Sequence, residues 1–331
     1  MLYDVYNFLS KLTFGKVANY LKLRLSYALS LLFRKPIIWG CPAFATIEPV
    51  NFCNLKCPEC PVGNGTLTRE KGLIKPELFR LITDSLSGNL LWLMLYFEGE
   101  PFLHQSLSEL IRYASSKKIY TVVSTNGHYL DEANAQKIID SGLDRIIISL
   151  DGADQETYSV YRRGGDFNTV VAGIKNLTRL KKENHVKKPL IIIQCLIMKH
   201  TENQFDKIRL LRKELGVDKV VFKTLQVTDF KKNLHLLPEN KNLSRYKISK
   251  GEHYSLKKKM SNHCHRIWDT IVFLQNGTTV PCCFDKDAAF ETGQFPRQTL
   301  LEIWKGEKLN RFRKQILHSR DTIQMCENCA E

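Results

Sequence analysis

Three cysteines, Cys53, Cys57 and Cys60, lie within eight residues of a chain of 331. Thiolates at such close spacing hold iron–sulfur clusters, and three thiolates on a four-iron cluster leave one iron open to a further ligand. A structural zinc site needs four closed ligands, and no other Cys or His follows before His104. The spacing therefore favours a 4Fe-4S cluster whose open iron binds a substrate or a cofactor.

A second group of cysteines lies near the end of the sequence, at Cys264, Cys282, Cys283, Cys326 and Cys329. The stretch IVFLQNGTTVPCC predicts a hairpin whose Asn276-Gly277 turn brings Cys264 close to Cys282. Two cysteine pairs joined by a hairpin suit zinc as well as an iron–sulfur cluster. Both kinds of site therefore stay open for this group.

Six short apolar runs alternate with longer helical patterns between residues 44 and 225. The predicted strands cover residues 44–50, 91–97, 119–125, 144–150, 190–197 and 219–225. The predicted helices lie near residues 76–87, 106–117, 131–141, 168–184 and 203–215. This alternation predicts an α/β fold with a parallel sheet, and its regular order favours a partial (β/α)6 TIM-like barrel over a doubly wound sheet.

Polar motifs follow four of these strands at their carboxyl ends. The three cysteines follow the first strand, EGEP follows the second, STNG follows the third and SLDG follows the fourth. In a barrel, the loops at this end of the strands form the active site. We therefore expect all four motifs to meet on one face of the barrel.

The spacing Cys53-x3-Cys57-x2-Cys60 after a first strand resembles the signature of the radical S-adenosylmethionine (SAM) superfamily, and the resemblance extends over most of residues 44–225. It implies that the amino and carboxylate groups of SAM bind the open iron. One electron from the cluster would then split SAM into methionine and a 5′-deoxyadenosyl radical, which abstracts a substrate hydrogen. A cellular one-electron donor such as flavodoxin or ferredoxin is the implied partner.

The same resemblance implies SAM contacts in the motifs that follow the strands. EGEP is similar to the family's GGEP, with Glu100 as the acceptor for the SAM ammonium group and Glu98 in place of a glycine. Gly99 is expected to let the backbone approach the ligand closely. Arginine suits the SAM carboxylate because its planar fork donates two hydrogen bonds, and Arg163 is preferred over Arg162. The implied cofactor-binding residues are Phe52, Asn54, Glu98, Gly99, Glu100, Asn126, Ser149, Asp151 and Arg163.

The C-terminal cysteines resemble the SPASM domain of this superfamily, in the shortened twitch form that binds one auxiliary cluster. The implied ligands of this second 4Fe-4S cluster are Cys264, Cys282, Cys326 and Cys329. Four ligands leave no open iron, so we expect this cluster to transfer electrons. Asp285 is the candidate acid or base for the substrate proton, and Cys283 has no assigned role.

Basic residues are concentrated in two segments of a chain whose net charge is +15. Residues 1–43 predict a basic amphipathic helical segment, interrupted near Gly15, whose apolar part is too short to span a bilayer. Either a cap on the barrel or a peripheral contact with an anionic membrane suits it. Residues 226–262 predict a basic linker, and residues 263–331 predict a small cysteine-rich α+β domain that binds the auxiliary cluster.

The sequence therefore predicts a cytoplasmic radical SAM enzyme of the oxidoreductase type, which oxidises a small sugar-like or lipid-head-group substrate. Modification of a peptide or protein, as in sulfatase maturation or ribosomal-peptide modification, is the alternative within the family. A zinc-binding nucleic-acid interaction protein is the alternative from another class. Nucleic acid is not the expected partner, because the basic residues 231–262 include only Tyr246 and Tyr254 to stack on bases.

Overall fold

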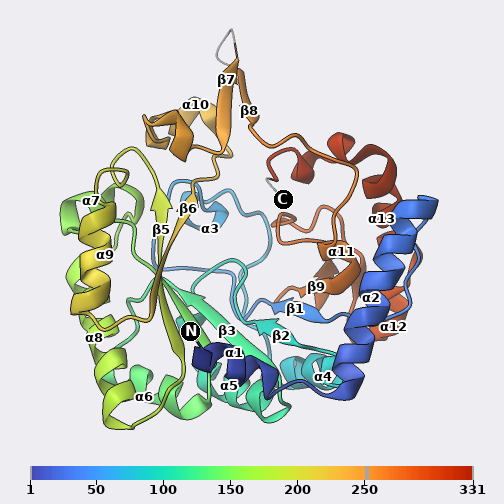
Figure 1. Cartoon of the computed structure of the whole chain (residues 1–331), viewed down its shortest axis with the longest axis horizontal. Helices are drawn as coiled ribbons and strands as arrows, with labels where there is room; N and C mark the ends of the chain where they lie inside the picture. Colours follow the sequence, from blue (N-terminus) through green and yellow to red (C-terminus); the bar gives the residue numbers. More distant parts are fainter. Residues whose placement is uncertain (1, 250–252, 330–331) are drawn as a thin grey trace.

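One sheet of nine strands runs through the part of the chain that the computed structural model describes, residues 2–249 and 253–329 (Figure 1). Neighbouring strands follow the order β11-β10-β9-β1-β2-β3-β4-β5-β6. The predicted linker at residues 226–262 and the predicted C-terminal domain at residues 263–331 therefore lie partly outside the described residues.

Strands β1 to β6 form the barrel part of this sheet, and each pairs in parallel with the next. Their bounds are β1 Phe44–Ile47, β2 Trp92–Met94, β3 Tyr120–Thr125, β4 Arg145–Ser149, β5 Leu190–Ile197 and β6 Lys219–Thr224. All six predicted strands are confirmed. Because β6 and β11 are the two ends of the nine-stranded order, the barrel is partial, as predicted.

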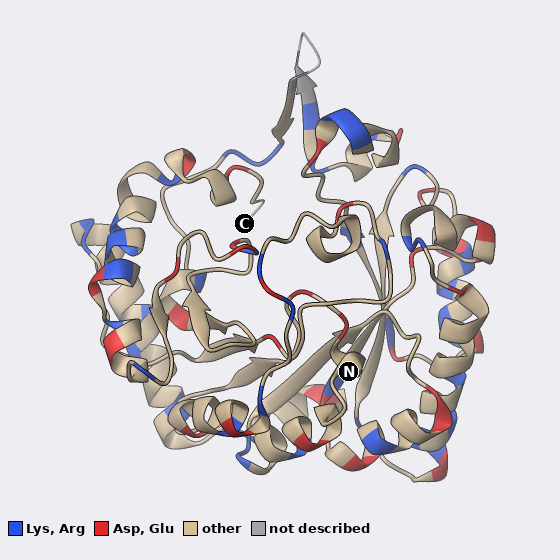
Figure 2. Ribbon diagram, turned by 180° about the vertical axis from the view of Figure 1, so that it is seen from behind, with Lys and Arg blue, Asp and Glu red and all other residues tan. Residues whose placement is uncertain are grey.

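Helices follow the strands, and most of them cover the outer face of the sheet (Figure 1). Their bounds are α3 Pro61–Asn64, α4 Pro76–Leu86, α5 Leu107–Ser116, α6 Glu132–Ser141, α7 Gln155–Tyr161, α8 Phe167–Glu183 and α9 Phe205–Glu214, with a 3-10 turn η1 at Pro101–Leu103. Helix α6 begins where the carboxylate of Asp131 accepts the amide of Asn134, and it ends at Gly142 with φ of 76°. Charged residues lie mainly on these outer helices (Figure 2).

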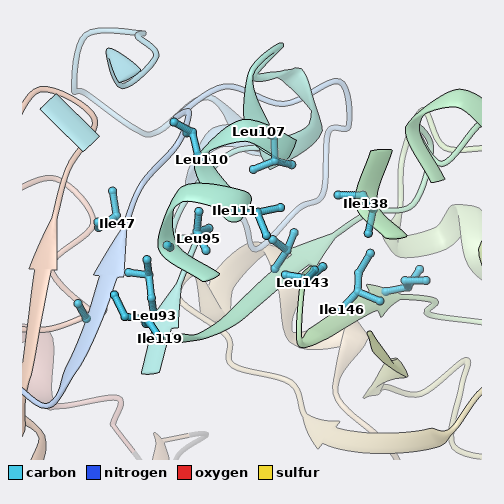
Figure 3. Close-up of a cluster of buried hydrophobic side chains, with 14 of the residues drawn as sticks. Ile47, Leu93, Leu95, Leu107, Leu110, Ile111, Ile119, Ile138, Leu143 and Ile146 are labelled. Atoms are coloured by element: carbon cyan, nitrogen blue, oxygen red, sulfur yellow. The ribbon is translucent and has the colours of Figure 1, made fainter. Parts of the chain in front are cut away.

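Aliphatic side chains fill the space between the sheet and the helices (Figure 3). Leu93 of β2 and Ile146 of β4 are fully buried, and Ile111 of α5 and Ile138 of α6 pack from the helix side. Isoleucine suits strands because its branched side chain packs well on a pleated surface. Truncating one of these side chains to alanine costs about 2–5 kcal/mol. This core fixes the ends of the strands, and hence the loops that carry the polar motifs.

Two helices, α1 Leu2–Leu9 and α2 Phe14–Phe33, form the predicted N-terminal helical segment. The break between them ends at Thr13, whose hydroxyl accepts the amide of Lys16 (3.3 Å) at the start of α2. Helix α2 lies along the edge of the molecule and packs against α11, Arg266–Asp269 (Figure 1). Within the described residues, no helix is both long enough and apolar enough to cross a bilayer.

The segment predicted as a linker has secondary structure of its own. It contains α10 Phe230–Asn233, the 3-10 turns η2 Leu234–Leu236 and η3 Lys241–Leu243, and the hairpin β7 Tyr246–Ser249 and β8 His253–Leu256. Tyr246 is buried in one apolar cluster with Leu55 and Cys57. The segment therefore covers the loop that carries the first three cysteines.

The C-terminal part extends the barrel's sheet instead of forming a separate one. Strand β9 (Thr270–Phe273) pairs in parallel with β1, and the predicted hairpin with β10 (Thr278–Val280) turns at Gly277, where φ is 87°. The remaining elements are β11 Gly293–Gln294, α12 Leu300–Trp304, α13 Glu307–Ser319, η4 Arg320–Thr322 and η5 Gln324–Cys326. A continuous sheet therefore holds the two cysteine groups in one frame.

Candidate active site

The loop after β1 carries Cys53, Cys57 and Cys60 and folds tightly on itself. The amide of Leu55 donates to Sγ of Cys53 (3.4 Å), and the amide of Cys60 donates to the carbonyl of Cys57 (3.2 Å). A side chain at Gly63 would lie 2.5 Å from the amide nitrogen of Cys57, so glycine is needed where α3 returns over the loop. All three cysteines belong to one apolar cluster with Leu55.

Burial changes the acid–base chemistry of these three thiols. Loss of water raises the pKa of Cys53 and Cys57, and the same effect together with the carboxylate of Glu98 raises the pKa of Cys60 to about 12. Thiolates are therefore costly at this site unless a positive charge compensates them. Metal binding supplies that charge because it replaces the thiol protons, so the donors suit a metal cluster.

Glu100 joins the second motif to the third. Its carboxylate accepts the hydroxyl of Thr125 (2.7 Å) and the amide of Asn126 (2.7 Å), and the residue is 1% exposed. The side-chain amide of Asn126 donates to Oδ1 of Asn54 (2.8 Å) and lies 3.6 Å from Sγ of Cys53. The EGEP, STNG and cysteine motifs therefore meet on one face, as predicted.

Gly99 lets two loops touch, which differs from the role predicted for it. Its φ is 77°, and a side chain there would lie 2.5 Å from the carbonyl oxygen of Val50 and 2.7 Å from that of Phe52. The amide of Glu100 donates to the same carbonyl of Phe52 (2.9 Å). The close approach that the structure shows is therefore to the backbone of the cysteine loop, and an approach to a ligand stays a prediction. Phe52 itself is half-buried.

Of the two adjacent arginines, Arg162 reaches the cysteine loop with its side chain, whereas Arg163 bonds to this loop through its backbone. Nε of Arg162 pairs with the carboxylate of Asp151 (2.5 Å), and Nη1 lies 3.7 Å from Sγ of Cys57. The side chain of Arg163 is exposed, and its backbone carbonyl accepts the amide of Lys56 (2.9 Å). The geometry therefore favours Arg162 over Arg163, and which of the two binds SAM stays a prediction.

Asp151 holds Arg162 in place. Its second carboxylate oxygen accepts the amide of Leu196 (2.6 Å), and the residue is fully buried. Both oxygens thus have partners within the protein, so the geometry gives Asp151 a positioning role where the sequence predicted a contact with SAM. Ser149 lies at the end of β4, two residues earlier, and is 8% exposed. Its role in SAM binding stays a prediction.

A cavity of about 510 Å³ lies between the two cysteine groups. Its lining includes Glu98, whose carboxylate is 3.7 Å from Sγ of Cys60, and it also includes Cys282. Nζ of Lys286 pairs with Glu98 (3.1 Å) in the same lining. Burial alone would lower the pKa of Lys286, but the negative charges of Glu98 and Cys60 raise it. Lys286 is therefore a cation in this cavity.

Cys283 and Arg266 also line the cavity, and Nη1 of Arg266 lies 3.9 Å from Sγ of Cys283. The sequence analysis left Cys283 without a role. Cys283 lines this larger cavity only. Cys282 lines it too, and it also lines a second, smaller cavity. Cys282 is therefore the member of the pair that joins the other C-terminal cysteines.

The four cysteines predicted as auxiliary ligands line that second cavity together: Cys264, Cys282, Cys326 and Cys329. Its other walls are largely apolar and include Ile267, Phe312 and Ile316. Convergence of four thiols on one small enclosed space is what a fully ligated cluster requires. The geometry thus supports this set of four ligands. The bonds from these four cysteines to a cluster stay a prediction.

Arg320 is the charged side chain closest to these four thiols. Its guanidinium donates to Sγ of Cys329 (3.3 Å) and to the carbonyl of His263 (2.7 Å). Burial raises the pKa of the Cys264 and Cys326 thiols, and the positive charge of Arg320 offsets part of that rise. A cation therefore stands beside the second cysteine group, and Arg320 is 1% exposed.

Asp285 lies outside the cavity lining that the structure describes. Its two carboxylate oxygens accept the amides of Ala289 (2.7 Å) and Phe290 (2.9 Å), and the residue is 3% exposed. These contacts close the turn that follows the cysteine pair. The geometry therefore does not favour the acid–base role predicted for Asp285, because the carboxylate is directed at its own backbone.

Three residues near the cysteines were missed from the sequence, namely Arg266, Lys286 and Arg320, and Arg162 was ranked behind Arg163. Arg162 could have been chosen from the pair Arg162-Arg163, but the sequence holds no signal for which of the two turns inward. The other three are ordinary basic residues in a chain with 49 of them. Only the packing of the C-terminal part against the barrel brings them to the site.

A sequence model of the radical SAM superfamily matches residues 47–212, which is half of the chain. The chain belongs to the radical SAM superfamily. A second model, of the SPASM iron–sulfur cluster-binding domain, matches residues 264–330. Radical SAM and SPASM domains carry a SAM-binding 4Fe-4S cluster, auxiliary iron–sulfur clusters and SAM, and these are the cofactors of this radical SAM enzyme.

Curated relatives of this radical SAM chain differ in what they act on. It is 29% identical over 178 residues to a probable GTP 3′,8-cyclase of Methanococcus maripaludis, covering 54% of this chain and 56% of that protein. The chain thus spans about half the length of this relative. It is 24% identical over 313 residues to the tungsten-containing aldehyde ferredoxin oxidoreductase cofactor-modifying protein of Pyrococcus furiosus, covering 86% of each.

Solved structures support the radical SAM fold. SuiB of Streptococcus suis, bound to S-adenosylmethionine, aligns with a TM-score of 0.65 at 16% identity and covers 88% of this chain and 71% of its own. BtrN, in complex with AdoMet and 2-DOIA, aligns with a TM-score of 0.52 at 17% identity and covers 88% and 93%. At these identities the likeness concerns the fold alone.

The family matches also bear on the kind of metal site that the thiols form. Across residues 2–249 and 253–329, no three Cys, His, Asp or Glu side chains converge as the ligands of one metal ion. A four-iron cube binds its thiolates at separate corners, whereas zinc draws its ligands to a single centre. The radical SAM and SPASM matches favour iron–sulfur clusters over the zinc-binding nucleic-acid alternative.

Proposed function

We propose that this radical SAM enzyme oxidises an anionic small molecule that binds in the cavity between its two cysteine groups. The observation that carries the proposal is that a single cavity of about 510 Å³ is lined by Glu98, beside Cys60, and by Cys282. A volume of that order accommodates a small organic ligand. A substrate in this cavity would have the SAM site on one side and the auxiliary site on the other.

The proposed SAM site lies around Cys53, Cys57 and Cys60, which would hold the 4Fe-4S cluster through three irons. What SAM and the reduced cluster supply, when bound, is a carbon radical that takes a hydrogen atom from an unactivated C–H bond. The residues of the chain would bind SAM and the substrate and orient them. Arg162 replaces Arg163 as the proposed partner of the SAM carboxylate, because it is the one held against the cysteine loop.

Glu100 and Asn126 are proposed to form the wall next to the SAM amino group. Three donors, the hydroxyl of Thr125 and the backbone amides of Asn126 and Phe102, already bind the Glu100 carboxylate. A carboxylate has about four acceptor positions, so capacity for an ammonium group remains. Asn54, which is exposed, and the half-buried Phe52 complete the side of this site that the cysteine loop provides.

The reaction is proposed to be a two-electron oxidation. A substrate that loses one hydrogen atom, and then a proton and an electron, gives a product with a new double bond, together with one methionine and one 5′-deoxyadenosine. The last electron needs an acceptor near the substrate. Cys264, Cys282, Cys326 and Cys329 are the residues that would hold it, and Cys282 also lines the substrate cavity. A flavodoxin or ferredoxin is the proposed electron donor.

The charge of the lining supports an anionic substrate. The described lining includes three cations, Lys223, Arg266 and Lys286, and one carboxylate, Glu98. Arginine and lysine bind phosphate and carboxylate groups through charge-assisted hydrogen bonds. A sugar phosphate or the phosphate of a lipid head group has this chemistry, which agrees with the small sugar-like or lipid-head-group substrate expected from the sequence.

Modification of a peptide is the second candidate, because a solved structure of SuiB bound to its precursor peptide SuiA aligns with a TM-score of 0.63 over 87% of this chain. One experiment separates the two. Reconstituted, reduced enzyme is mixed with SAM and with deuterated sugar phosphates, lipid head groups or peptides, and deuterium in 5′-deoxyadenosine is measured. Transfer from an anionic small molecule supports the proposal. Transfer from peptides alone, or no 5′-deoxyadenosine from iron-loaded enzyme, overturns it.

A further inference from the structure

Helix α2 presents its apolar side to the solvent. Phe14, Val17, Leu21, Leu25 and Leu32 are 91%, 41%, 62%, 53% and 72% exposed. They recur every three, four or seven residues, which at about 100° per residue places them on one narrow face of the helix. A surface helix of a globular protein normally turns this face inward. A contiguous apolar stripe left in water marks an interaction site.

The opposite face of α2 buries Leu23 and is also bound to the protein through polar side chains. Asn19 exchanges two hydrogen bonds with the backbone of Cys41, through its amide nitrogen (2.9 Å) and its oxygen (2.8 Å). The hydroxyl of Ser30 accepts the indole N–H of Trp268 (3.0 Å) and the amide of Ile37 (2.9 Å). These buried bonds would all break if the helix rolled to hide its apolar stripe. The outward orientation is therefore part of the fold.

Positive charge borders the apolar stripe. Lys22 and Arg24 are exposed and lie on its two sides along the helix, and Arg34 and Lys35 follow its end. No Asp or Glu occurs between Asp4 and Glu48. Two exposed aromatic side chains, Phe33 (58%) and Trp39 (51%), lie close to the same end in the sequence. A helix that lies in a membrane interface has this pattern: apolar residues are flanked by basic ones, and aromatic residues lie at the edge.

We propose that α2 docks this enzyme on the surface of an anionic lipid bilayer, with the helix parallel to the membrane plane. The stripe of Phe14, Val17, Leu21, Leu25 and Leu32 enters the acyl boundary, and Lys22, Arg24, Arg34 and Lys35 meet the lipid phosphates. Helix α2 has 20 residues and is about 30 Å long, so the contact is wide enough to orient the molecule. Exposed Leu2, Val5, Tyr6 and Leu9 of α1 add apolar surface next to it in the sequence.

Charge also argues against a second copy of the chain as the occupant of this face. Self-association through α2 would bring Lys22 and Arg24 of one copy against the same residues or against Arg34 and Lys35 of the other. Like charges brought together in an interface are unfavourable. An anionic bilayer has the complementary charge, and each basic residue close to such a surface strengthens binding by about fivefold.

The test uses the iron-loaded protein without SAM or substrate, so its result does not depend on the proposed reaction. Sedimentation is measured with vesicles of phosphatidylcholine alone and of phosphatidylcholine with phosphatidylserine. The variant L21E/L25E alters the stripe. The control variant L210E/L301E alters two leucines on α9 and α12 that are exposed to a similar extent, 55% and 50%. Circular dichroism and iron content verify that each variant is folded.

The expected result is that wild-type protein and L210E/L301E sediment with phosphatidylserine vesicles, and that L21E/L25E binds at least tenfold more weakly. K22Q/K35Q should lose most of the preference for anionic over neutral vesicles, and so should added salt. Absence of binding by the wild type, or equal binding by L21E/L25E, overturns the proposal. A wild-type dimer in light scattering that L21E/L25E converts to a monomer also overturns it, because the face then belongs to a second copy.

Discussion

The two cysteine groups of this radical SAM enzyme differ in number, origin and charge. Cys53, Cys57 and Cys60 come from a single loop of eight residues, beside the carboxylate of Glu98 and an open cavity. The second group draws four thiols from segments up to 65 residues apart and encloses them in an apolar cavity beside Arg320. Three predicted ligands would leave one iron of the first cluster open to a cofactor, and four predicted ligands would leave none in the second.

The two cysteine groups therefore depend on the fold in different ways. The first group comes from one local loop, whereas the second depends on contacts between segments that are distant in the sequence. The contiguous loop of the first group follows β1 and is folded by close backbone approaches at Gly63 and Gly99. The second group forms only when the hairpin of β9 and β10, helix α13 and the last turn pack together around Trp268 and Ile316. Mutations should therefore uncouple the two centres, and the variants below are ordered by the size of the expected effect.

The triple variant C53A/C57A/C60A should lose SAM cleavage completely while keeping its second centre. Iron should fall from about eight to about four per chain, as expected for the loss of one of two four-iron clusters. The measurements are iron content and 5′-deoxyadenosine after reduction. Retained cleavage would show that SAM does not bind at the loop of Cys53.

The double variant C326S/C329S should have the opposite pattern. Iron should again fall to about four per chain, but 5′-deoxyadenosine should still form while the oxidised product disappears, because the substrate radical lacks its acceptor. Product analysis by mass spectrometry provides the measurement. Undiminished product would remove the second centre from the reaction.

Substitution of Arg162 should weaken SAM binding more than substitution of Arg163. R162K keeps the charge opposite buried Asp151 but loses the planar fork, so the Kd for SAM should rise about tenfold, equivalent to about 1.4 kcal/mol. R163K changes an exposed side chain, and its Kd should stay within about twofold. Equilibrium binding to iron-loaded protein measures both. Equal effects would argue against a role for Arg162 at the first centre.

Removal of the Arg320 charge should act on the second centre only. A cation beside a cluster favours its reduced, more negative form, so R320Q should lower the reduction potential of this cluster by an amount on the order of tens of millivolts. R311Q, on the exposed face of α13, is the control. Redox titration followed by electron paramagnetic resonance measures the shift. An unchanged potential in folded R320Q would contradict the assignment.

The smallest effect is expected for D285N. Its carboxylate accepts two backbone amides, and loss of one strong acceptor should lower the free energy of unfolding by about 1 kcal/mol. Product formation should stay within a few-fold of wild type. A loss of a hundredfold or more in product, with SAM cleavage retained, would instead restore Asp285 as the base.

The sequence predicted the barrel, and the meeting of the EGEP, STNG and cysteine motifs on one face of it, because both depend on local patterns. Strand and helix alternation over residues 44–225 is periodic, and the loop of Cys53, Cys57 and Cys60 is contiguous. The errors concern choices that depend on packing. Whether Arg162 or Arg163 turns inward depends on the buried partner Asp151, and Asp285 turned toward two amides that follow it in the chain.

Other features were beyond sequence reasoning for the same reason. The pairing of β9 with β1 places Lys286 beside Glu98, although the two are 188 positions apart. The stripe on α2 was visible as an amphipathic pattern, but only the buried bonds of Asn19 and Ser30 show which side faces the solvent. Periodicity thus defined the faces of this helix, and long-range contacts determined their orientation.

The most direct test of the difference between the two centres is whether labelled SAM couples magnetically to each cluster. Electron–nuclear double resonance is measured on reduced protein with SAM that has ¹⁵N in its amino group. Coupling is expected in the wild type and in C326S/C329S, and no coupling is expected in C53A/C57A/C60A, although its remaining cluster is reduced. Coupling in the triple variant, or none in the wild type, would contradict the account.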